Sequence, residues 1–144
     1  MAVAVLDTNV LFAGLSARDE YHGPASEIVR GIDHGDLPEA IVTEYVVAEA
    51  LNLVRERLWP DAANGLLGRL VEGAHFEITH VPQADFTAAQ GIFRRYPALS
   101  FVDATIVAYL RRTDREFLYS FDGGFDAVEG VTRLTTPDDP FGPS

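Results

Sequence analysis

Short apolar segments alternate with longer segments of helical periodicity along the chain. The apolar segments predict strands at residues 3–6, 40–42, 76–81, 117–121 and 131–134. The segments between them predict helices at residues 8–13, 24–34, 44–58, 61–72, 82–96 and 101–112. This order is typical of an α/β fold, in which right-handed helical crossovers join parallel strands. We therefore expect a three-layer, Rossmann-like arrangement, with a central parallel β-sheet of about five strands flanked by helices.

The same pattern predicts a single domain. At 144 residues the chain is long enough for one core and too short to suggest two. Prolines recur after residue 136, so we expect a domain over residues 1–136 and an irregular tail over residues 137–144. No apolar run is long enough to span a membrane, and the N-terminal run lacks the basic flank of a secretory signal. We therefore expect a cytoplasmic protein.

Four acidic residues interrupt or end strongly apolar runs: Asp7, Glu49, Asp103 and Asp122. An ionised carboxylate taken out of water costs several kcal/mol unless it is neutralised, paired or bound to a cation. Four such positions in one small domain call for a common explanation. A shared Mg²⁺ or Mn²⁺ ion would supply it, because both ions prefer oxygen ligands.

Three of these carboxylates also have simpler structural explanations. Asp7 comes directly after the first predicted strand, where its side chain could cap the following helix. Asp103 stands three residues after Ser100, which is the spacing of a capping box. Asp122 precedes two glycines and is therefore well placed in a turn. Capping and metal binding are compatible, so the sequence leaves both roles open.

Glu49 is harder to explain by structure alone. It lies in a helix with apolar residues on nearly every face, so we expect its side chain to be buried. The alternative to a metal is an ion pair with an arginine. Glu44 is five positions earlier and about 140° round the helix, so it cannot share that face. We expect Glu44 to act on the helix dipole from the first turn.

The amino-acid composition argues against several classes of functional site. The formal net charge is −11, and all 11 basic residues are arginine. P-loop proteins need a lysine at the phosphates, and response regulators and haloacid-dehalogenase-like phosphohydrolases also use one, so the lack of lysine argues against all three classes. The absence of cysteine excludes disulfides and thiolate zinc sites. An acidic, lysine-free surface is also expected of a protein from a halophilic source.

No other residue type offers a competing site. The histidines have no metal-ligand spacing, and no nucleophile elbow or dinucleotide-binding motif occurs. Arginines cluster near predicted helix ends, at Arg94, Arg95, Arg111 and Arg112. There they could pair with the negative end of a helix dipole or contact the phosphates of a nucleic acid.

The segments around the four carboxylates resemble the PIN domain family, particularly its VapC-type toxin branch. The resemblance covers residues 2–135 and rests on Leu6-Asp7-Thr8-Asn9, Glu49, Leu99-Ser100-Phe101-Val102-Asp103-Ala104 and Ser120-Phe121-Asp122-Gly123-Gly124-Phe125. PIN domains are α/β proteins with a central parallel sheet and an acidic cluster that binds Mg²⁺ or Mn²⁺ to cleave RNA. The resemblance implies a metal site at Asp7, Glu49, Asp103 and Asp122, supported by Thr8, Asn9 and Ser120. The family often has threonine where this chain has Ser120. Asp126 is a further candidate ligand just beyond the matched motif.

The resemblance also implies a function. It suggests a metal-dependent endoribonuclease, the toxin of a type II toxin–antitoxin pair, with RNA as substrate, an antitoxin as partner and a homodimeric assembly. Hard cations held by oxygen ligands would activate a water for attack on a phosphodiester. Arg94, Arg95, Arg111 and Arg112 are then candidate RNA contacts. Two alternatives remain open: a housekeeping PIN nuclease in RNA processing or quality control, and a PIN-fold binding module without turnover.

Overall fold

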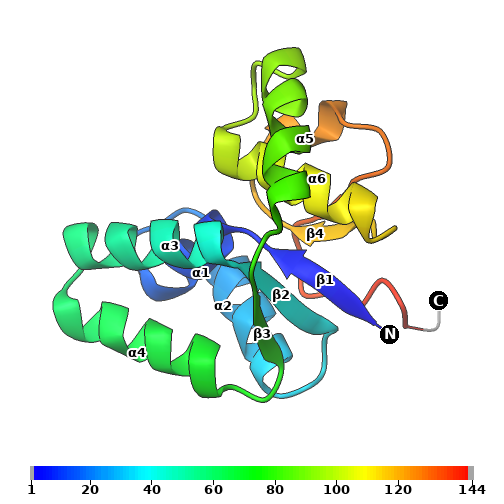
Figure 1. Cartoon of the computed structure of the whole chain (residues 1–144). Helices are drawn as coiled ribbons and strands as arrows, with labels where there is room; N and C mark the ends of the chain where they lie inside the picture. Colours follow the sequence, from blue (N-terminus) through cyan, green and yellow to red (C-terminus); the bar gives the residue numbers. More distant parts are fainter. Residues whose placement is uncertain (1, 143–144) are drawn as a thin grey trace.

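A parallel sheet with helices packed around it forms the centre of the molecule (Figure 1). The computed structural model describes residues 2–142. Its strands are β1 (Val3–Leu6), β2 (Glu39–Thr43), β3 (Phe76–Thr79), β4 (Phe117–Tyr119) and β5 (Thr132–Leu134). They lie in the order β3-β2-β1-β4-β5, and every neighbouring pair is parallel. The predicted α/β fold with five parallel strands is therefore confirmed.

The helices pack in consecutive pairs, α1 with α2, α3 with α4, and α5 with α6. Their bounds are α1 (Thr8–Leu15), α2 (His22–Asp33), α3 (Glu44–Arg57), α4 (Pro60–Glu72), α5 (Gln83–Arg95) and α6 (Phe101–Arg112), with a 3-10 turn η1 (Gly123–Ala127). In Figure 1, α5 and α6 stand above the sheet, apart from α1 to α4. Among the helices of residues 2–142, none has both the length and the apolar character needed to cross a bilayer.

The order of the strands places a crevice beside β1. From β1 the chain moves to β2 and β3 on one side, and it returns to the other side of β1 as β4 and β5. In parallel sheets, ligands bind at such a switch point, outside the carboxyl ends of the strands. Asp7 follows β1 and Ser120 follows β4, so two polar side chains emerge together at this point.

Two strands end two residues earlier than the sequence predicts, and the reason is the same in both. The predicted strand at 117–121 ends at Tyr119, because the Phe121 N–H donates to Asn9 Oδ1 at 3.1 Å rather than to a strand. The predicted strand at 76–81 ends at Thr79, and the Val81 N–H donates to Glu44 Oε1 at 2.6 Å. In both places a polar side chain takes up the backbone N–H and ends the hydrogen bonding between strands. The apolar content of the sequence alone could not predict these strand ends.

Residues 135–142 run along the sheet without helix or strand. The buried Tyr119 donates its hydroxyl to the carbonyl of Asp138 at 2.7 Å. The ring of Phe141 meets that of Phe117 edge to face, with centroids 5.0 Å apart. This segment is therefore tied to β4 at two points. Residues 143 and 144 of the predicted tail lie outside the described part of the chain.

Candidate functional site

A cavity of about 780 Å³ opens at the switch point of the sheet. Its wall comes from the ends of β1 and β4, from α1, α3 and α6, and from the segment between α1 and α2. All four carboxylates that the sequence singled out line it: Asp7, Glu49, Asp103 and Asp122. Thr8 and Asn9 line it too. The fold therefore brings together acidic residues that are up to 115 positions apart, as 122 − 7.

Asp7 is the most deeply placed of the four, with 3% of its surface exposed. It caps α1, since Oδ1 accepts from the Thr8 N–H at 2.8 Å. Oδ2 accepts from the Ser120 hydroxyl at 2.8 Å and from the Asn9 amide at 3.3 Å. Burial raises the pKa of Asp7 to about 6 against these hydrogen bonds, and repulsion from Glu49 and Asp122 adds to the rise. The capping role is real, and it coexists with a place in the cavity.

Asp103 also combines two roles. It closes a capping box with Ser100, whose N–H donates to Asp103 Oδ2 at 3.0 Å while its hydroxyl accepts from the Asp103 N–H. The carboxyl is nevertheless buried, and the charge on Asp7 opposes its ionisation. Burial and then this repulsion raise the pKa of Asp103 to about 7. Two carboxyls with raised pKa values are thus buried in one cavity.

Glu49 does not have the predicted burial: its side chain is exposed. α3 buries only the stripe formed by Val46, Ala50 and Val54, so the apolar residues elsewhere on the helix do not cover Glu49. Within residues 2–142 it forms no ion pair with an arginine, which also removes the alternative explanation. Glu49 instead lines the cavity from the side of α3.

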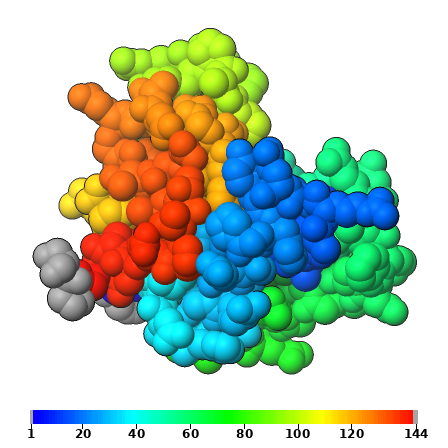
Figure 2. Space-filling model, turned by 180° about the vertical axis from the view of Figure 1, so that it is seen from behind, coloured from blue at the N-terminus to red at the C-terminus, as the bar shows by residue number. Residues whose placement is uncertain are grey.

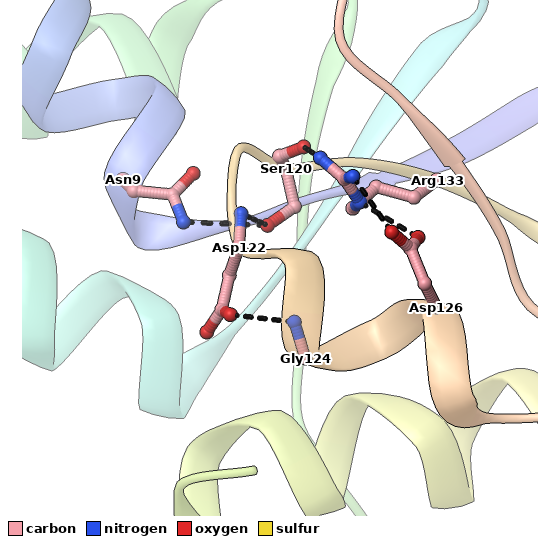
Figure 3. A network of polar contacts seen from close by, with 6 residues as sticks. All are labelled: Asn9, Ser120, Asp122, Gly124, Asp126 and Arg133. Carbon is pink, nitrogen blue, oxygen red and sulfur yellow. Dashed lines mark hydrogen bonds and ion pairs between the residues drawn. The ribbon is translucent and has the colours of Figure 1, made fainter. Parts of the chain in front are cut away.

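Asp122 lies in a hydrogen-bonded network that joins the first turn of α1 to the segment after β4 (Figure 3). Its Oδ1 accepts from the Gly124 N–H at 2.9 Å, which is the turn role that the sequence suggested. Its own N–H donates to the Ser120 hydroxyl oxygen at 3.0 Å, and that oxygen also accepts from the Asn9 amide at 3.3 Å. Ser120 therefore holds both Asp7 and the backbone of Asp122 in place.

Asp126 is placed differently from the other candidates. Its two oxygens accept from Nε and Nη2 of Arg133, each at 2.9 Å (Figure 3). Arg133 also donates from Nη1 to the Ser120 carbonyl at 3.3 Å. This guanidinium holds the pKa of Asp126 below its usual value. Asp126 does not line the cavity, and both its oxygens are already engaged.

The predicted RNA contacts Arg94, Arg95, Arg111 and Arg112 do not line the cavity. Arg112 donates from Nε to the buried Asp85 at 2.7 Å, and Arg95 lies over the ring of Tyr96. Arg57 is the arginine on the cavity wall, and the sequence reasoning missed it. Its signal was the spacing: Glu49, Leu53 and Arg57 follow at intervals of four, so they share one face of α3.

The donors in the cavity fit a divalent cation by their chemistry. All are oxygens, which Mg²⁺ and Mn²⁺ prefer. The carboxyls of Asp7 and Asp103 are buried and have no arginine partner among residues 2–142. The Thr8 hydroxyl is buried beside them and has no hydrogen-bond partner in the described chain. Within residues 2–142, however, no three acidic or histidine side chains already converge tightly enough to enclose an ion. Asp7, Asp103 and Asp122 each accept a hydrogen bond from a backbone N–H, so metal binding would require these side chains to adjust.

The chain and its fold can be compared with those of known proteins. The family model for the PIN domain matches residues 4–131. No curated protein sequence matches the chain significantly.

Solved structures agree with the family match. The chain resembles Mycobacterium tuberculosis VapC20, described as a sarcin-ricin loop cleaving toxin, with a TM-score of 0.75 and 25% identity over 88% of this chain and 94% of that one. A toxin–antitoxin complex from Klebsiella pneumoniae has a TM-score of 0.64 at 20% identity, covering 94% and 98% of the two chains. VapBC2 from Rickettsia felis, bound to a promoter DNA fragment, has a TM-score of 0.66 at 10% identity, covering 92% and 97%. The last two likenesses show the fold alone.

Proposed function

The chain belongs to the PIN domain family, and we propose that it is a divalent-metal-dependent endoribonuclease that acts as the toxin of a toxin–antitoxin pair. One observation carries the proposal. Four carboxylates from separate segments line a single cavity, and the two that are buried have no cationic partner among residues 2–142. Such an arrangement is costly for folding and useful for holding a cation.

Asp7, Glu49, Asp103 and Asp122 would hold Mg²⁺ or Mn²⁺, and Thr8 would bond a ligand in the cavity through its free hydroxyl. When bound, the cation would offset charge on the phosphodiester and make a water acidic enough to attack phosphorus at neutral pH. Ser120 and Asn9 fix the orientation of Asp7 by donating to its Oδ2. Within residues 2–142 no histidine lines the cavity, so the carboxylates are the groups available to accept a proton.

The toxin role is supported by the structural neighbours. VapC20 is described as a toxin that cleaves the sarcin-ricin loop, and two other neighbours are described as toxin–antitoxin or VapBC assemblies. By analogy we infer a protein antitoxin that covers the cavity, and an RNA substrate. A homodimer remains a prediction from the family resemblance.

Cleavage of RNA by the purified protein tests the enzymatic part. We expect cleavage with Mg²⁺ or Mn²⁺, none after chelation, and none by Asp7→Asn. Asp126→Asn is the matched control, because it removes a carboxylate of the same type that lies outside the cavity. Cleavage that survives in Asp7→Asn, in a protein shown to be folded by circular dichroism, would contradict the assignment.

Expression in a bacterial host tests the toxin part separately. A toxin should arrest growth when produced alone, and Asp7→Asn should relieve the arrest. An active nuclease that leaves growth unchanged would instead favour a housekeeping role. A folded protein without metal binding or cleavage would favour the non-catalytic binding module.

A further inference from the structure

Two aromatic rings on the cavity wall are stacked on each other. The rings of Tyr21 and Phe121 have centroids 4.5 Å apart and planes within 5° of parallel. Both residues line the cavity that holds the carboxylates. In Figure 2 the blue surface of the segment around residue 20 adjoins the orange surface of the segment that follows β4. The side chain of Tyr21 is 41% exposed, so this ring is accessible to a ligand.

Hydrogen bonds between backbone and side chains hold the chain next to both rings. The Tyr21 N–H donates to Asp19 Oδ1 at 2.9 Å, and the next residue, His22, places its Nδ1 2.8 Å from the Ala13 carbonyl. The Phe121 N–H donates to Asn9 Oδ1 at 3.1 Å. The backbone of both residues is therefore held while their rings stack on each other, and such pre-organisation lowers the entropic cost of binding.

Acidic side chains dominate the cavity wall, and this limits how an RNA could bind there. Asp19 and Glu20 line the cavity beside the four carboxylates, and Arg57 is the one arginine that lines it in the described part of the chain. The whole chain carries −11. Most proteins gain affinity for RNA from many arginine and lysine contacts to phosphates, a source that is weak here. Stacking of a base on an aromatic ring does not depend on charge and works with any base.

We propose that Tyr21 and Phe121 form a stacking platform for an unpaired RNA base next to the cleaved phosphate. The inference rests on the proposed function, and it names the residues that would hold an unpaired base beside the carboxylates. Phe121 directly precedes Asp122, so a base on the platform lies beside the carboxylates. The face of a base in a duplex is covered by its neighbours, whereas a base in a loop can be splayed out onto a ring. The cavity volume of about 780 Å³ leaves room for a nucleotide.

Steady-state cleavage of a looped RNA tests the platform. Tyr21→Ala should raise KM roughly 10-fold and leave kcat within about two-fold, since base stacking is worth that much by alanine substitution. Tyr21→Phe keeps the ring and should behave as wild type. Phe141→Ala is the matched control: Phe141 is 48% exposed, contacts one phenylalanine ring, and lies outside the cavity. Its KM should not change, and thermal unfolding should show all three variants folded.

Two further readouts separate stacking from other roles. The KM penalty of Tyr21→Ala should persist at high salt, whereas that of Arg57→Ala should shrink as phosphate contacts are screened. A looped RNA with 2-aminopurine beside the cleavage position should lose fluorescence when it binds the Asp7→Asn protein, and Tyr21→Ala should abolish the loss.

The outcomes distinguish this inference from the proposed function. If wild type cleaves no RNA but quenches 2-aminopurine placed in the loop of the RNA, and Tyr21→Ala abolishes this quenching, the proposed function fails and base stacking on the two rings stands. If wild type cleaves RNA and Tyr21→Ala cleaves it with unchanged KM and unchanged quenching, the platform is wrong. If that variant instead loses affinity only for an antitoxin peptide, the rings serve a protein partner, which also overturns the inference.

Discussion

Buried acidic residues in two regions of this molecule have opposite surroundings. Between α5 and α6, the buried Asp85 has an arginine partner, with Arg112 Nε 2.7 Å from its Oδ1. In the cavity, Asp7 and Asp103 are 3% and 6% exposed, and no arginine or lysine pairs with either within residues 2–142. The charges that raise their pKa values are those of other carboxylates. The same chain thus pairs a buried charge in one region and leaves two unpaired in another.

The difference indicates which region is built for stability and which for function. The ion pair neutralises Asp85 and joins two helices. The cavity carboxyls gain no such compensation, so burial raises their pKa values to about 6 and about 7. The exposed Asp126 differs from them, because Arg133 beside it lowers the pKa of that carboxyl. An energetic cost concentrated in a cavity is expected of a binding site, because a ligand can offset it.

The strongest way to sharpen this comparison is to remove a cavity charge. Asp103→Asn keeps an oxygen that can accept from the Ser100 N–H and removes a charge that opposes Asp7. We expect a roughly 100- to 1,000-fold loss of RNA cleavage, with the metal-free protein roughly 2–4 kcal/mol more stable at pH 7.5. Cleavage kinetics and urea unfolding measure the two effects. A variant that is inactive and also less stable would break the comparison.

The converse experiment removes the arginine that pairs with the buried Asp85. Arg112→Ala leaves Asp85 buried without its partner, and we expect a loss of about 2 kcal/mol in unfolding free energy. That is less than for a fully buried pair, because the side chain of Arg112 is 44% exposed. Arg111→Ala is the control on the same helix, with an exposed arginine outside any ion pair in the described chain. Equal stability of the two variants, measured by urea unfolding, would mean that the pair contributes little. A raised KM for RNA in either variant would support the predicted phosphate contact.

A smaller effect is expected from pH. The pKa values of Asp7 and Asp103 in the folded protein, about 6 and about 7, lie above their ordinary value of 3.8. The folded state therefore holds more protons than the unfolded state between about pH 4 and pH 7, and these two groups lower stability as pH rises through that range. The melting temperature of the chelated protein should be lower at pH 7.5 than at pH 5. Asp103→Asn should show a smaller drop, and an equal drop in both proteins would assign the pH dependence to other groups.

The sequence predicted the fold and most of the site because both follow from local patterns. Alternating apolar segments place the strands, and acidic residues at strand ends and helix starts meet at one edge of a parallel sheet. Asp7, Asp103 and Asp122 are in this class, and each also plays the capping or turn role that local rules suggested.

The errors and omissions concern contacts between distant segments. The exposure of Glu49 depends on which stripe of α3 meets the core, and apolar content does not reveal that stripe. The stacking of Tyr21 on Phe121 joins residues 100 positions apart in segments that looked like a loop and a strand end. The pairing of Asp126 with Arg133 depends on how η1 folds back beside β5. None of these has a periodic signal in the sequence.

Titration calorimetry with Mn²⁺ tests the central claim most directly, because it reports whether the unpaired carboxylates bind a cation regardless of substrate. Wild type should bind Mn²⁺ at millimolar concentration or below, and its melting temperature should rise on binding. Asp7→Asn should lose this binding, and Asp126→Asn should keep it. Absence of binding by the folded wild-type protein, or loss of binding in Asp126→Asn but not in Asp7→Asn, would contradict the claim.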